Sequence, residues 1–238
     1  MKQVTKRASP TEFEDWKTRG AVDWQPTYAD LQRPEKQILH HALLDEQGWV
    51  CCYCGGAVTE KNSHIEHFRP QSDFGALQLN YDNLHASCMG TSRQALDDRE
   101  DGANGSRSVK RLPTFCGDAK RDQFDEARHI SPADPNCESR FIYTQTGQIL
   151  PSDHGDSSAS YMLGILALDV QHLRAAREEV LKAFDSAFLA TVTADELMQL
   201  RDAFRTRDAD GKLKPYGHVA ARYAEQRLAD LQQPAAGA

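Results

Sequence analysis

The sequence predicts an α+β fold that is mainly helical. Apolar residues recur at helical spacing before residue 48 and again after residue 157, which indicates helices in both terminal parts. Between these parts the chain carries short apolar runs and grouped cysteines, which indicate strands and a metal site. We therefore expect a small metal-containing unit of strands and one helix, embedded between an N-terminal helical arm and a C-terminal helical bundle.

The composition is that of a globular protein. The chain has 238 residues, of which 39% are hydrophobic and 26% are charged, and a chain of this length can bury a core without disulfides. No apolar run approaches the ~18 residues that span a membrane, and acids at Glu12, Glu14 and Asp15 stand where a secretion signal would be apolar. We therefore expect a cytoplasmic protein with no membrane partner, where grouped cysteines bind metal more often than they form disulfides.

The charge balance argues against a protein that coats DNA with its whole surface, because the formal net charge is −7. One stretch, between residues 105 and 121, is locally basic and has Asp118 as its only acid. Its basic residues are Arg107, Lys110, Arg111, Lys120 and Arg121. This stretch is either a local contact for nucleic acid or a solvated loop.

The first 48 residues predict a helical arm. A short helix is expected near Glu12–Lys17, and an irregular segment should follow because Pro26 and Pro34 interrupt any longer helix. From Glu35 an apolar stripe predicts a second helix that ends near Gly48.

Four cysteines could close a metal site in the next segment, residues 49–125. Cys51 and Cys54 have the C-x-x-C spacing and precede two glycines, a pattern typical of a knuckle that points two thiolates at one ion. Cys88 and Cys116 could complete a tetrahedral, structural zinc site, or they could be small buried hydrophobic residues. Because the cysteines bracket the glutamate and histidine described next, we favour zinc.

The same segment predicts a hairpin around these two residues. Val58 and Ile65–Phe68 are expected to form its strands, and Pro70 should end the second strand. Residues 82–88 are expected to form a turn that enters a helix. Residues 89–111, rich in Gly, Ser, Asp and Arg, indicate an inserted loop.

Glu66 and His67 are the candidate catalytic residues. Phosphodiester hydrolysis needs a base that takes a proton from water and a cation that neutralises charge on the phosphorane. His67 could be the base and Glu66 could hold a divalent metal, while Asn83 could bond across the hairpin and orient His67. The alternative is an exposed Glu66 beside a core histidine, and His85 is expected to be a packing or surface residue.

The last segment, residues 126–238, predicts a hairpin followed by helices. The hairpin should begin at Phe141–Tyr143, before a glycine-containing turn. Apolar stripes at helical spacing follow, and Thr193 with Glu196 matches a capping box. A last helix is expected over His218–Leu231.

These motifs together resemble an HNH endonuclease with a ββα-metal finger. They are His64–Pro70 (HIEHFRP), Tyr81–Leu84 (YDNL), the C-x-x-C pair, Cys88, and Cys116-Gly117 followed by Lys120. Their order is similar to that in the HNH proteins of prokaryotic anti-phage systems, the Septu (PtuB) and retron-associated family. The likeness extends to the helix before Cys51, the hairpin from Glu138 to Pro151 and the segment Leu163–Arg177, so it covers most of the chain.

The resemblance implies a metal-dependent nuclease that hydrolyses nucleic acid, with DNA as the expected substrate, beside a structural zinc. His67 would activate water with the help of Asn83, and Glu66 would hold Mg²⁺ or Mn²⁺. Arg69 and the basic stretch would contact the nucleic acid. The family also implies a partner ATPase of the ABC/SMC-like type (PtuA) and, in retron systems, a reverse transcriptase with its DNA.

One position departs from the family pattern. The residue after the last cysteine is usually a metal-binding His or Asn, and in this chain it is Gly117. Asp118, His64 or Asp122 could supply the missing ligand, and we favour Asp118. The alternative function is a zinc-stabilised adaptor that binds DNA or the ATPase without cutting, which Gly117 and the acidic net charge favour. A thiol redox role for the C-x-x-C pair would leave Glu66 and its neighbouring histidine unexplained.

Overall fold

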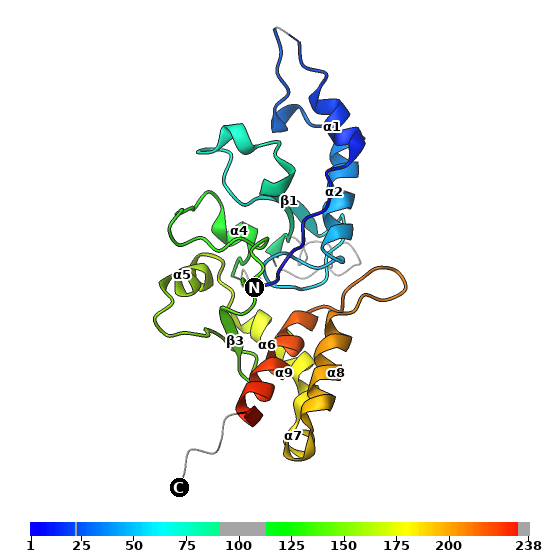
Figure 1. The fold of residues 1–238 in the computed structure, drawn as a ribbon. Helices are drawn as coiled ribbons and strands as arrows, with labels where there is room; N and C mark the ends of the chain where they lie inside the picture. The colour runs from blue at the N-terminus through cyan, green and yellow to red at the C-terminus, as the bar shows by residue number, and fades with distance from the viewer. Residues whose placement is uncertain (22, 91–112, 233–238) are drawn as a thin grey trace, which may run out of the picture.

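The computed structural model describes residues 1–21, 23–90 and 113–232 of the chain. Over these residues the fold is mixed α and β with two separate two-stranded sheets, as predicted. Figure 1 shows the N-terminal helices at one end, the last helices at the other end, and the strands between them. The predicted loop 89–111 lies outside the described residues from residue 91 onward.

Two helices form the N-terminal arm, and both lie where the sequence predicts them: α1 (Thr11–Lys17) and α2 (Glu35–Glu46). Leu39 and Leu43 are fully buried on α2, because residues four apart share one face of a helix. The chain turns after α2 at Gly48, whose φ of 66° is a left-handed conformation that glycine adopts without strain.

The central hairpin pairs β1 (Ser63–His67) with β2 (Leu84–Cys88) in antiparallel register, with Glu66 opposite His85. The sequence predicted Val58 in the partner strand and, over residues 82–88, a turn that enters a helix; the strand at Val58 and the helix are both wrong. Val58 is buried outside any strand, next to an isolated bridge between Val50 and Ala57. A short 3₁₀ helix (Tyr81–Asn83) leads into β2 instead.

A single helical turn, α4 (Gly117–Lys120), packs on one face of this hairpin. The Lys120 ammonium donates to the backbone carbonyl of His67 at 3.0 Å, and the backbone N–H of Gly117 donates to Ser87 Oγ at 3.2 Å. The order of these elements is therefore strand, strand and helix.

The C-terminal part begins with the predicted second hairpin, β3 (Phe141–Tyr143) paired with β4 (Ile149–Pro151). Five α-helices follow, α5 (Ser157–Ile165), α6 (Gln171–Leu181), α7 (Ser186–Thr191), α8 (Ala194–Arg205) and α9 (Gly217–Gln232). Other short 3₁₀ helices cover Tyr28–Asp30, Gly75–Leu77 and Lys182–Phe184. The predicted capping box at the start of α8 and the predicted last helix are both confirmed.

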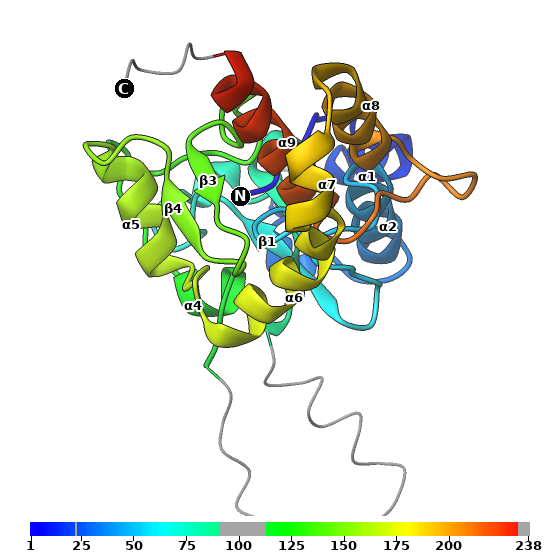
Figure 2. The ribbon, with the colours of Figure 1, turned by 90° about the horizontal axis from the view of Figure 1, so that it is seen from below.

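One hydrophobic core includes residues from all three predicted segments, 1–48, 49–125 and 126–238. The N-terminal residues cross its centre: Met1 and Val4 are buried, and the backbone N–H of Lys2 donates to the Tyr53 carbonyl at 3.2 Å. Figure 2 shows the N-terminus enclosed by the sheets and the C-terminal helices. Among the described helices, none has both the length and the apolar character needed to cross a membrane.

Candidate functional site

Four cysteine sulfurs meet beside the central hairpin. Cys51 and Cys54 come from the turn after α2, Cys88 ends β2, and Cys116 precedes α4. All four Sγ atoms lie within 4.8 Å of one another, and Cys54 Sγ lies 3.9 Å from Cys88 Sγ. Thiolates held ~2.3 Å from a tetrahedral zinc ion lie about 3.8 Å apart. The four cysteines can therefore hold one metal ion, as predicted.

The environment of Cys51 favours its thiolate form. Burial raises the pKa of the Cys51 thiol, but hydrogen bonds from neighbouring thiols, that of Cys116 first, outweigh burial and hold this pKa well below its usual value. The other two cysteines, Cys52 and Cys137, are buried outside the group.

Glu66 lies on one face of the hairpin and contacts three side chains. It is 7% exposed; Oε1 accepts from the Tyr53 hydroxyl at 3.1 Å and pairs with the Lys120 ammonium at 2.9 Å. Oε2 lies 3.3 Å from His64 Nε2. His64 shares this face because alternate residues of a strand point to the same side.

The charges on this face stabilise one another. Burial raises the pKa of Glu66, but the His64 hydrogen bond and the Lys120 charge outweigh burial, so this pKa is lowered and the carboxylate is ionised at neutral pH. Burial lowers the pKa of His64, but the bond to Glu66 outweighs it and the pKa is raised, with a further contribution from the charge of Asp118. Buried charges need such partners to offset the loss of hydration.

Asp118, the favoured metal ligand, lies near this pair. Its negative charge contributes to the raised pKa of His64. Among the described residues, only the four cysteines form a group of three or more metal-binding side chains with all ligand atoms within 4.8 Å. Glu66 and His64 therefore offer two neighbouring ligand atoms, Oε2 and Nε2. Asp118 does not lie close enough to both to complete a group of three metal-binding side chains.

Gly117 packs directly against the Glu66 and His64 side chains. A Cβ atom at this position would lie 2.6 Å from Glu66 Oε2, 2.8 Å from His64 Nε2 and 3.0 Å from Ser87 Oγ. Such distances are shorter than van der Waals contact, so a side chain at position 117 requires these groups to move. The glycine is therefore matched to the close approach of α4 to the hairpin.

We expect Gly117→Ala to destabilise the fold by about 1–3 kcal/mol, the usual cost of overpacking. Gly164→Ala is the matched control: it lies inside α5, and an added Cβ atom meets nothing within 4 Å. The control should stabilise the fold by up to about 1 kcal/mol, because alanine is the better helix former. Denaturant unfolding measures both free energies, and equal effects of the two substitutions would contradict the close packing at position 117.

His67 points to the opposite face of β1 from Glu66, because neighbouring residues of a strand point to opposite sides. It is 8% exposed, and its ring packs edge-on against Tyr28 with the ring centroids 4.5 Å apart. Glu66 and His67 therefore serve different faces of the hairpin.

A backbone carbonyl fixes the protonation of the His67 ring. Nε2 lies 3.0 Å from the Gln78 carbonyl oxygen, which can only accept, so Nε2 carries the proton. The lone pair is then on Nδ1, which accepts from the side-chain amide of Gln71 at 3.2 Å. Burial lowers the pKa of His67 and outweighs the opposite effect of the Gln78 bond. His67 is therefore a neutral imidazole with one basic nitrogen at pH 7.

Asn83 bonds across the hairpin to the backbone. Its Oδ1 accepts from the Arg69 backbone N–H at 2.8 Å, and its Nδ2 donates to the carbonyls of Arg69 at 3.0 Å and Leu77 at 3.3 Å. Leu77 precedes Gln78, whose carbonyl holds the imidazole of His67. These hydrogen bonds thus connect Asn83 to the backbone after His67 and before Gln78, and none of them reaches the His67 ring.

The predicted contacts for nucleic acid differ in exposure. Lys120 is 1% exposed, a position that leaves no surface for nucleic acid. The Arg69 guanidinium lies 5.8 Å from the ring centroids of both Phe74 and Phe124, and Arg121 is exposed. The remaining three, Arg107, Lys110 and Arg111, lie outside the described residues.

Sequence reasoning missed the contacts that Tyr53, Gln71 and Gln78 make with the candidate catalytic residues. His64 could have been placed beside Glu66, because the two residues are two apart on a predicted strand. The hydroxyl of Tyr53 has no comparable signal, and neither have Gln71 and Gln78, since their contacts depend on how the chain folds back.

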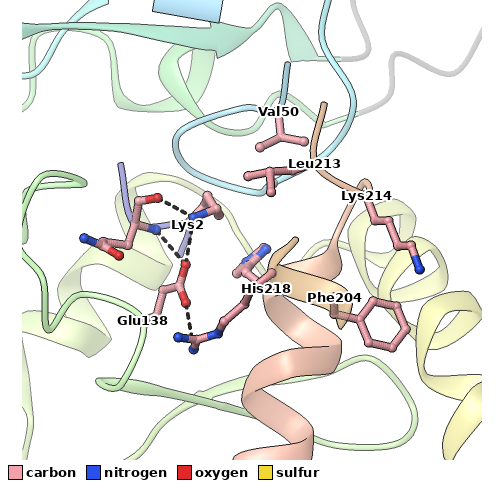
Figure 3. A pocket seen from close by; sticks show the side chains of 10 residues that line it. Lys2, Val50, Glu138, Phe204, Leu213, Lys214 and His218 are labelled. Atoms are coloured by element: carbon pink, nitrogen blue, oxygen red, sulfur yellow. Dashed lines mark hydrogen bonds and ion pairs between the residues drawn. The ribbon is translucent and has the colours of Figure 1, made fainter. Parts of the chain in front are cut away.

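A cavity of about 160 Å³ lies where the N-terminal arm meets α8 and α9, and its lining includes neither Glu66 nor His67. Figure 3 shows Glu138 at its wall, where the carboxylate pairs with Lys2 Nζ at 3.1 Å and with Arg205 Nη2 at 3.4 Å. The backbone N–H of Gln3 also donates to Glu138, at 2.9 Å. These bonds hold the N-terminal arm against the C-terminal helices.

Comparison of the sequence with models of protein families and with curated proteins gave no match.

Proposed function

We propose that this protein is a metal-dependent nuclease of the HNH type in which His67 is the base that activates water. The observation that carries the proposal is the state of the imidazole: the Gln78 carbonyl fixes its tautomer, and burial keeps it neutral. A general base works best when its unprotonated form prevails at the working pH. Gln71, which occupies the basic nitrogen, is an exposed residue, so a water molecule can take its place with little rearrangement.

The residues around His67 support this role. When Nδ1 takes a proton from water, the ring becomes positive, and the Gln78 carbonyl stabilises that charge through the bond to Nε2. Asn83 acts as a positioning residue, because it ties the segment after β1 to the segment that carries Gln78.

Glu66 fits a divalent cation. Its carboxylate is ionised, and Oε2 faces His64 while Lys120 pairs with Oε1. Carboxylate oxygens are the ligands that Mg²⁺ and Mn²⁺ prefer. When bound, the cation would neutralise charge on the phosphorane and the leaving oxygen. The four cysteines offer no open position and so suit a structural zinc ion.

The surface around Arg69 supports a nucleic acid substrate. Its guanidinium lies 5.8 Å from the ring centroids of Phe74 and Phe124, which contact each other edge-on, and Phe124 also contacts His129 at a centroid distance of 4.4 Å. Partly exposed aromatic rings and arginine planes are the groups on which bases stack. Arg69 and Phe74 follow β1, which carries His67, whereas Phe124 and His129 follow α4.

Cleavage assays test this function. Purified protein is incubated with supercoiled plasmid and with single-stranded DNA, in Mg²⁺, in Mn²⁺ and in EDTA, alone and with an ABC/SMC-like ATPase co-expressed from the same locus. We expect cleavage that needs the divalent cation. Binding of DNA without cleavage in every condition would reject the nuclease.

A zinc-stabilised adaptor is the second candidate, and two observations favour it. Glu66 and His67 lie on opposite faces of β1, and Glu66 is already paired with the Lys120 ammonium. An adaptor would bind DNA or the ATPase equally well after His67→Ala. This substitution therefore separates the two functions, because it should abolish cleavage by a nuclease and leave the binding of an adaptor unchanged.

A further inference from the structure

We infer that His64 is a ligand of the divalent cation at Glu66 and takes the place of a side chain at position 117. The inference rests on the nuclease proposed above and concerns a different residue from its base. The inference concerns metal affinity, so it can be wrong even if the protein is a nuclease.

The first observation is the position of the His64 ring. His64 Nε2 lies 3.3 Å from Glu66 Oε2, and both groups come from the same face of β1. Two ligands at right angles, each ~2.1 Å from an ion, lie about 3.0 Å apart. The two atoms therefore need only a small adjustment in position to bind one cation between them, and the cation displaces the proton of their hydrogen bond to solvent.

The second observation is that His64 and a side chain at position 117 exclude each other. The Cβ position at Gly117 is 2.8 Å from His64 Nε2 and 2.6 Å from Glu66 Oε2. A His or Asn at position 117 would thus extend into the space of the His64 ring, toward the same carboxylate oxygen. One imidazole in this space leaves no room for a second ligand-bearing side chain.

The third observation is access. The His64 side chain is 30% exposed, whereas that of Glu66 is 9% exposed. A hydrated cation can therefore reach Glu66 Oε2 past the His64 ring, and solvent can supply its remaining ligands. Such cations commonly keep several waters and use only one or two side chains. Lys120 stays on the other oxygen, Oε1, and does not occupy this position.

The test measures Mn²⁺ binding to the full-length, zinc-loaded protein by titration calorimetry and by the loss of the free Mn²⁺ electron paramagnetic resonance signal. We expect His64→Ala to weaken Mn²⁺ binding at least about tenfold. His40→Ala is the matched control, because His40 Nε2 contacts Ser63 Oγ on the same strand at 2.9 Å but is not part of the cation site. The control should bind Mn²⁺ like the wild type.

An exchange of positions makes the test specific. His64→Ala removes the ring that occupies this space, whereas Glu66 Oε2 and Ser87 Oγ, 2.6 Å and 3.0 Å from the added Cβ atom, must still shift. The double variant His64→Ala with Gly117→His should therefore recover part of the lost Mn²⁺ affinity. Gly117→His alone should lower the melting temperature, because both rings then compete for one space. If His64→Ala folds poorly, as judged by zinc content and melting, the double variant decides the question.

The outcomes separate the two proposals. Unchanged Mn²⁺ affinity in His64→Ala overturns the role of His64 even if the wild type cuts DNA, and so does a folded, zinc-loaded double variant that recovers none of the lost affinity. Absence of Mn²⁺ binding by the wild type overturns it as well. Suppose that Mn²⁺ binding depends on His64 but the protein cuts no DNA under any condition. This result would support His64 as a metal ligand and reject the proposed nuclease activity.

Discussion

Cys54→Ala is expected to abolish metal binding by the four-cysteine group and to unfold the central hairpin. A structural zinc site contributes on the order of 10 kcal/mol to folding, which is as large as the whole stability of a typical domain. The cysteines join three separate segments, since Cys51 and Cys54 precede the hairpin, Cys88 ends it and Cys116 precedes α4. Loss of one thiolate therefore disconnects the elements that carry Glu66 and His67.

Zinc content measured by mass spectrometry and thermal unfolding check this prediction. We expect one zinc per wild-type chain and none in Cys54→Ala. The cooperative unfolding transition of this variant should be lost or should move to a much lower temperature. Cys52→Ala and Cys137→Ala are matched controls, because both cysteines are fully buried but lie outside the group. They should keep the zinc and lose about 1–2 kcal/mol of stability. Equal zinc content in all variants would contradict a four-cysteine site.

The helix positions were predictable because their signals involve few neighbouring residues. At the start of α8, Glu196 N–H donates to Thr193 Oγ1 at 3.2 Å, and Thr193 N–H donates to Glu196 Oε2 at 2.8 Å. Such a capping box depends on residue types three apart. The strand β2 was missed because five residues that are almost all buried show no clear period, and the choice of partner strand depends on tertiary pairing.

The candidate site was predictable only in part, for a similar reason. Cysteine spacing indicated the sulfur group because C-x-x-C is a local pattern, but nothing local shows that Lys120 lies buried against Glu66. In the sequence Lys120 belongs to a basic stretch, which favoured an exposed role. Its burial follows from the turn of α4, which directs the lysine into the hairpin face, where the buried carboxylate needs a cation.

His67→Ala is expected to reduce DNA cleavage by about 10²–10⁴-fold, the usual contribution of a general base. Binding of zinc and DNA should stay within about twofold, because His67 contacts neither the cysteine group nor an exposed surface. His41→Ala is the control, since His41 pairs with Glu60 at the surface and its side chain is 57% exposed. Gel-based rates with saturating Mg²⁺ measure the effect. A variant that cuts at the rate of the wild type would remove His67 from the mechanism.

The pH dependence identifies the base independently of the substitution. The pKa of His67 is lowered from 6.5 by burial, so the neutral form persists below pH 6.5, and cleavage should fall only as pH drops through this lowered pKa. Two other histidines would place the fall near pH 4 and pH 3, because burial lowers the pKa of the half-buried His129 to about 4 and that of the fully buried His85 to about 3. Rates at saturating Mg²⁺ between pH 4 and pH 8 locate the midpoint. A midpoint of the rate above pH 6.5 would require a base whose protonated form the protein stabilises. Such a midpoint would contradict His67 as the base, because burial lowers the pKa of its ring.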